Sequence, residues 1–157
     1  LDTKTTSAPY TPPNPNEHQR YIEEVLSKKK LDYENDLTAD PRYQVDLTDK
    51  LELALARMQA HQKHFGNFSS DWNIYLDVGL GYIYRIPFNF ETKITKLAPE
   101  EMQRPFLRIG VDYPLMLRIL ERKAHWNNAE IGSHLRYYRE PNEFQRTVHF
   151  MLSYLQC

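Results

Sequence analysis

Two pairs of glutamate and histidine in "ERKAHWNNAEIGSHLRYYRE" have a spacing that could support chemistry. Glu121 precedes His125 by four residues and Glu130 precedes His134 by four, so each pair would share one face of a helix. A carboxylate beside an imidazole is a common acid–base or metal-binding pair. Di-iron bundles, however, need a three-residue spacing with further carboxylates, and zinc proteases need His-Glu-x-x-His, which this chain lacks. We interpret both pairs as ordinary helix surface.

No other catalytic pattern is present in the sequence. There is no Gly-x-Ser-x-Gly nucleophile elbow. His61 and His64 have no carboxylate beside them, and we place them in the last turn of a helix, where positive charge is favoured. The one cysteine, Cys157, is the last residue, where a nucleophile is hard to hold in place. We predict no catalytic residue, no metal site and no cofactor; a metalloenzyme using histidine and carboxylate is the alternative.

The segment "SHLRYYREPNEFQR" offers a binding surface instead, because arginine and tyrosine alternate in it. Arg136, Tyr137, Arg139 and Arg146 could stack on bases and hold phosphates, as RNA-binding surfaces do. Tyrosine and arginine are also enriched at the strongest contacts between proteins. The alternative is that a tyrosine packs inside and the arginines form a solvated face. We predict a partner- or RNA-binding site of these four residues, together with Tyr10 near the N-terminus.

The balance of charge differs between the two ends of the chain. The net charge is -1, but residues 1–60 carry 8 basic against 11 acidic side chains, and residues 104–157 carry 8 against 5. Seven of those last eight basic residues are arginine, which binds carboxylates and phosphates through a planar fork. The C-terminal third therefore suits acidic partners, although so small an excess does not by itself predict nucleic-acid binding.

Residues 1–15 differ from the rest of the chain in composition. They hold four of the ten prolines and almost nothing apolar, so they cannot build a core and should run as extended chain. They also lack the basic and apolar segments of a signal peptide. We predict an extended proline-rich arm over residues 1–15, which could lie on a partner's surface, and a single globular domain over residues 16–157.

Apolar residues at helical spacing, with capping residues before them, recur along the chain. Thr48 is placed to cap the clearest of these segments, and Asp112 and Pro114 are typical of a helix start. One further helical turn is expected after a proline in "APEEMQRPF". The predicted helices cover residues 17–29, 48–65, 112–126, 127–140 and 141–155.

Period-two alternation replaces this pattern in the middle of the chain. Over residues 72–86 it predicts a strand, since a helix would have to hold Gly79 and Gly81 at about 1 kcal/mol each. Alternation resumes over residues 87–97, with a proline at the bend. A competing strand in "FLRIGVDYPLMLRIL" is not adopted, because Pro114 interrupts it. The predicted fold class is α+β, mainly α: a helical domain with one central β-hairpin or small antiparallel sheet.

These features together favour a non-catalytic structural or assembly subunit of a larger multi-subunit complex. The alternative outside enzymology is an RNA-contacting protein of a ribonucleoprotein. We expect other protein subunits as partners, nucleic acid in that alternative, and no small-molecule substrate. No stretch reaches the ~20 apolar residues of a membrane-spanning helix. Because one cysteine cannot form a disulfide within the chain, we expect a reducing intracellular compartment, either cytoplasm or organelle matrix.

Overall fold

The computed structural model describes residues 14–91 and 93–156. The chain divides into two compact units, Leu1–Asn35 and Asp36–Cys157. Within the described residues no helix combines the length and the apolar character needed to cross a membrane.

The described part of the first unit, residues 14–35, begins with the α-helix α1 (Pro15–Glu24). The Asn14 side chain caps it by accepting a 3.0 Å hydrogen bond from the Asn16 N–H, and a proline occupies the first position, where its missing N–H costs nothing. The helix predicted over residues 17–29 therefore begins earlier, and it ends in a 3-10 turn, Leu26–Lys28.

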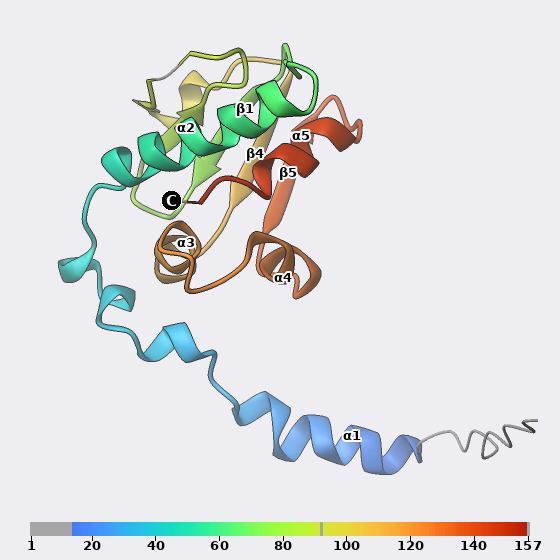
Figure 1. Ribbon diagram of the computed structural model, residues 1–157. Coiled ribbons are helices and arrows are strands. Elements are labelled where there is room, and N and C mark those ends of the chain that lie inside the picture. The colour runs from blue at the N-terminus through green and yellow to red at the C-terminus, as the bar shows by residue number, and fades with distance from the viewer. Residues whose placement is uncertain (1–13, 92, 157) are drawn as a thin grey trace, which may run out of the picture. The chain divides into compact units, whose positions relative to one another are not determined.

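Five strands form a mixed sheet in the second unit, in the order β3-β2-β1-β4-β5 (Figure 1). β1 and β4 run parallel, and the other three neighbouring pairs are antiparallel. The prediction of a single hairpin or small antiparallel sheet is therefore wrong. The strands are β1 (Asn73–Asp77), β2 (Ile83–Ile86), β3 (Thr95–Leu97), β4 (Phe106–Gly110) and β5 (Arg136–Glu140).

Part of the correction concerns the segment predicted as one long strand over residues 72–86. It is a hairpin of β1 and β2, and the two glycines form its turn. Gly79 and Gly81 have φ angles of 79° and 80°, in the left-handed region that glycine enters without steric cost. The alternation continued across the turn, so period alone did not reveal the break.

The other part of the correction concerns β4 and β5. Tyr138 was assigned to a helix over residues 127–140, but it lies in β5 opposite Arg108 of β4. The rejected strand interpretation was right for residues 106–110, because Pro114 stands at the start of the next helix, α3 (Tyr113–Leu120), beyond the end of β4.

Helices cover one face of this sheet. α2 (Thr48–His64) and α5 (Arg146–Leu152) lie side by side over it (Figure 1). The strand register aligns one row of side chains on this face: Tyr84, Leu76, Ile109 and Tyr137, from β2, β1, β4 and β5. Tyr84, Leu76 and Ile109 are fully buried.

The adjacent row points to the opposite face and is largely polar. It consists of Arg85, Tyr75, Arg108 and Tyr138. Arg85 pairs with Glu91 at 3.2 Å. The Arg108 guanidinium pairs with the Asp77 carboxylate at the end of β1. The arginine charges of this face are therefore already balanced within the chain.

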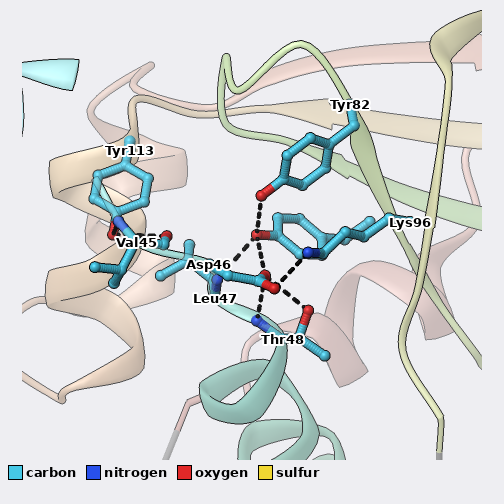
Figure 2. A network of polar contacts seen from close by, with 8 residues as sticks. Val45, Asp46, Leu47, Thr48, Tyr82, Lys96 and Tyr113 are labelled. Carbon is cyan, nitrogen blue, oxygen red and sulfur yellow. Dashed lines mark hydrogen bonds and ion pairs between the residues drawn. The ribbon is translucent and has the colours of Figure 1, made fainter. Parts of the chain in front are cut away.

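Asp46 joins the start of α2 to two strands (Figure 2). Its Oδ1 accepts hydrogen bonds from the N–H and hydroxyl of Thr48, at 3.1 and 2.8 Å, and from the Tyr84 hydroxyl at 3.1 Å. Its Oδ2 pairs with the Lys96 ammonium of β3. Burial alone would raise the pKa of Asp46, but these hydrogen bonds outweigh it and hold the pKa at about 2.

The Tyr84 hydroxyl completes this group of contacts, which we call the Asp46 network. It accepts a 2.9 Å hydrogen bond from the Leu47 N–H and lies 3.1 Å from the Tyr82 hydroxyl. Burial raises the pKa of Tyr84, so the phenol keeps its proton. Each polar side-chain atom named here has a partner, and the network fixes the first turn of α2 against the sheet.

Candidate functional site

A second polar region surrounds His149, a buried residue of α5. Its side chain is 8% exposed. The imidazole ring lies between Tyr137 of β5 and Phe144, with ring centroids 4.8 and 4.7 Å away. Val148 and Met151 of the same helix are buried in the core, so the packing of α5 fixes where the imidazole lies.

Four buried polar atoms in this region make no hydrogen bond of good geometry with the residues that the structure describes, although Glu130 lies near both His149 Nδ1 and the Tyr137 hydroxyl. They are both ring nitrogens of His149, the Tyr137 hydroxyl oxygen and the indole nitrogen of Trp126, which begins α4 (Trp126–Ile131). The Glu130 carboxylate lies 3.4 Å from His149 Nδ1. Buried polar atoms are nearly always hydrogen-bonded in folded proteins, and each unpaired one costs about 1–3 kcal/mol. We call Trp126, Glu130, Tyr137 and His149 the His149 cluster. The concentration of such polar atoms distinguishes this cluster from the rest of the core.

The imidazole at the centre of the cluster is neutral at neutral pH. Burial lowers the pKa of His149, and the negative charge of Glu130, which acts in the opposite direction, does not overcome it. Burial also raises the pKa of Tyr137, and Glu130 raises it further. A neutral imidazole and a neutral phenol beside a carboxylate are suited to hydrogen bonding.

Two arginines border the His149 cluster. The Arg139 guanidinium lies 5.7 Å from the centre of the Phe144 ring, which is a cation–π contact. Arg146 is exposed, and no ion pair involves it among residues 14–91 and 93–156. Every other arginine in that part of the chain has an ion pair, a ring contact or another interaction. Arg146 is thus an exposed arginine with no ion pair to the described residues, which leaves its guanidinium able to bind an outside anion.

Two neighbouring hollows share Arg146 and Phe150 in their linings. The first, which we call the α4–α5 pocket, has a volume of about 390 Å³ and is also lined by Glu130, Phe144 and His149. The second has a volume of about 350 Å³ and is lined by aromatic residues at the end of α2.

Exposed aromatic rings surround the second hollow. Phe65, Phe68 and Phe150 are 40%, 37% and 46% exposed. The Phe150 ring lies 5.5 Å from Phe65 and 5.6 Å from Tyr154, so the rings form one patch. We call these four residues the aromatic surface. Contiguous exposed apolar rings with polar residues around them are a feature of protein interaction sites.

The predicted site residues are only partly brought together. Tyr137, Arg139 and Arg146 all lie at the His149 cluster or the α4–α5 pocket. Arg136 projects to the opposite face of the sheet, where its guanidinium lies 3.6 Å from Asp112. Consecutive residues of a strand point to opposite faces, so the arginines and tyrosines of β5 are divided between the two faces of the sheet. Tyr10 lies outside the described residues.

The two glutamates of the predicted glutamate–histidine pairs, Glu121 and Glu130, have other neighbours in the structure. Glu121 binds Lys50 and Lys123 at 3.0 and 2.8 Å, and these two ammonium groups lower the pKa of Glu121. Glu130 approaches His149, with its Oε1 3.4 Å from His149 Nδ1. No group of three or more histidine, cysteine, aspartate or glutamate side chains that could hold a metal occurs among the residues that the structure describes.

The contact between Glu130 and His149 was missed by sequence reasoning. The two residues are 19 positions apart, on helices separated by β5. No motif has that spacing, and residues 127–140 had been assigned to one helix, so no sequence signal could have paired them.

Comparisons with known proteins place the chain in no family. No family model matches the sequence, and no curated protein matches it. A similar solved structure is described as "UbiJ-SCP2 Ubiquinone synthesis protein"; it is 12% identical, the match covers 73% of this chain and 90% of that one, and the TM-score is 0.43. This likeness is too distant to bear on what the chain does.

Proposed function

We propose that this chain is a non-catalytic subunit of a larger protein assembly, and that the aromatic surface with Arg146 is a contact to another subunit. The observation that supports this most directly is the adjacency of exposed rings to a guanidinium with no ion pair in the described part of the chain. Aromatic side chains and arginine are the residues that contribute most at protein interfaces. Elsewhere the described arginines have partners within the chain.

Isolation of the chain from its source under gentle conditions tests this role. A tagged chain should elute in an assembly well above its own 18.7 kDa, and native mass spectrometry should find other proteins in it. The double variant Phe65→Ser, Phe150→Ser should elute as the free chain. Leu53→Ser is the matched control, because Leu53 is 65% exposed on α2 but outside the aromatic surface. A wild-type chain that elutes alone, or a double variant that stays assembled, overturns the proposal.

The proline-rich arm is tested in the same experiment. Residues 1–13 lie outside the described residues, so their contribution to contacts, including that of Tyr10, is part of the proposal and rests on the sequence. Deletion of residues 1–13 should weaken the assembly if the arm lies on a partner. Full retention of every partner would remove the arm from the proposed function and leave the aromatic surface as its contact.

The RNA-contacting alternative predicts a different outcome. Its four residues lie on both faces of the sheet, with β5 as the edge strand between them, so an RNA strand touching all four would have to pass around that edge. Such an assembly should fall apart on treatment with ribonuclease, and its stability should fall steeply with salt. An assembly of proteins should survive ribonuclease.

A further inference from the structure

The α4–α5 pocket has features of a ligand site, in addition to the protein contact proposed for the aromatic surface. Its volume of about 390 Å³ is within the range of small-ligand pockets. Phe144, Phe150 and Tyr154 supply aromatic walls, while His149, which contributes to the lining, is itself more than nine-tenths buried, and its Nε2 makes no hydrogen bond to the described residues. Apolar walls with a few polar groups are typical of sites that bind a specific small group.

The side of the pocket formed by Arg146 favours an anion. The pocket contains one cation, Arg146, and one carboxylate, Glu130. Glu130 has a neighbour within the chain, since its Oε1 lies 3.4 Å from His149 Nδ1. Arg146 has no ion pair in the described part of the chain, and a guanidinium binds a carboxylate through two parallel hydrogen bonds. A ligand carboxylate would therefore pair with Arg146, whereas a ligand cation would compete with His149 for Glu130.

We propose that the α4–α5 pocket binds a carboxylate attached to an apolar group, with the carboxylate on Arg146 and the apolar group against Phe144 and Phe150. This goes beyond the proposed subunit role, because it assigns a chemical class of ligand to one pocket. Two sources supply the same chemistry: an acidic residue or chain terminus of a partner, and a free carboxylic acid. No reaction is involved, and the ligand is bound unchanged.

A titration of the purified chain, observed by NMR, tests the ligand class without any partner. The probe is 3-phenylpropionate, and 2-phenylethylamine has the same ring and a similar linker with the opposite charge. We expect 3-phenylpropionate to shift the resonances of Phe144, Arg146 and Phe150 in a saturable way, with a millimolar or lower Kd. The Trp126 indole N–H, buried in the adjoining cluster, is a convenient second reporter. The amine should bind more weakly.

Substitution of the guanidinium locates the site. Arg146→Gln should weaken 3-phenylpropionate binding about tenfold or more, since a charge-assisted pair is lost. Arg136→Gln is the matched control, because Arg136 lies on the opposite face, and it should leave binding unchanged. No saturable shift, equal binding of the amine, or unchanged binding by Arg146→Gln would each overturn the proposal.

The two sources are separated by adding 3-phenylpropionate to the intact assembly. Release of the chain identifies a partner's carboxylate as the natural occupant, and binding without release identifies a free acid. This experiment and the elution experiment fail independently: a chain that elutes alone removes the subunit role without affecting the titration, and a chain that ignores the probe removes the pocket without affecting assembly.

Discussion

The Asp46 network and the His149 cluster are both polar regions on the helix-covered face of the same sheet, and they differ in where their hydrogen bonds go. The Asp46 carboxylate receives hydrogen bonds from α2, β2 and β3. In the cluster, His149 Nε2 makes no hydrogen bond to the described residues, and the contacts of His149 Nδ1 and the Tyr137 hydroxyl with Glu130 are not hydrogen bonds of good geometry. A polar group satisfied within the chain stabilises the fold. Unsatisfied buried groups beside exposed rings and an unpaired arginine mark the region where binding is expected.

The largest effect should come from removing the centre of the Asp46 network. Asp46→Ala leaves the first turn of α2 and the Tyr84 hydroxyl without their shared acceptor, and we expect the free energy of unfolding to fall by about 2 kcal/mol. Urea denaturation measures this change in the free energy of unfolding. Asp71→Ala, an exposed carboxylate outside the network, is the control and should change stability by less than about 0.5 kcal/mol. Equal effects of the two substitutions would contradict the role assigned to Asp46.

A matched pair of substitutions in one row of the sheet tests the difference between the two polar regions. Tyr84→Phe removes a hydroxyl with three contacts and should lower the free energy of unfolding by about 1.5 kcal/mol. Tyr137→Phe removes a hydroxyl that makes no hydrogen bond of good geometry with the described residues and should change the free energy of unfolding by less than about 0.5 kcal/mol. Both are measured by thermal and urea unfolding. If Tyr137→Phe costs as much as Tyr84→Phe, the two regions do not differ as described.

Replacement of the buried imidazole should act in the opposite direction. His149→Leu exchanges a desolvated polar ring for an apolar side chain and should raise the free energy of unfolding by about 1 kcal/mol. The same variant should bind 3-phenylpropionate more weakly, because the pocket loses its buried polar group. A destabilised His149→Leu chain would show that the imidazole makes stabilising hydrogen bonds. It would then contradict the difference drawn between the His149 cluster and the Asp46 network.

The smallest expected effect is the pH dependence of the Asp46 network. The pKa of Asp46 is about 2 in the folded chain and ~3.9 in an unfolded one, so its contribution is complete above about pH 4 and is lost as pH falls toward 2. Because the side chain is 48% exposed, solvent screens these bonds and the loss should be less than about 1 kcal/mol. Unfolding of wild type and Asp46→Asn across this range measures it. Parallel curves would contradict the contribution of the carboxylate.

Local signals were sufficient for the helices that carry strong boundaries. Thr48 marked the start of α2, although the capping oxygen comes from Asp46, and Asp112 with Pro114 marked the start of α3. Those boundaries depend on neighbouring residues in sequence, which a single chain displays directly. The same pattern failed at Tyr138, where helical spacing was present but pairing with β4 determines the conformation. Pairing between distant strands leaves no mark at either strand alone.

The candidate site shows the same division. Tyr137, Arg139 and Arg146 were expected to bind partners from their composition, and they lie in one region on the helix-covered side. Their grouping with Glu130 and His149 depends on how α4, β5 and α5 pack. Residue types alone could nominate arginines and tyrosines, but the face that each one occupies follows from the strand conformation, which the sequence analysis did not predict.

The parallel pairing of β1 with β4 has a kinetic consequence. Asn73 lies beside Phe106, and the chain between them first makes β2 and β3, so closing this pair costs more loop entropy than closing the β1–β2 hairpin. β5 joins the sheet only through β4. The α4–α5 pocket borders two helices beyond this pairing, so we expect a nascent or half-folded chain not to present it. A partner that recognises this pocket would therefore select chains whose folding is complete.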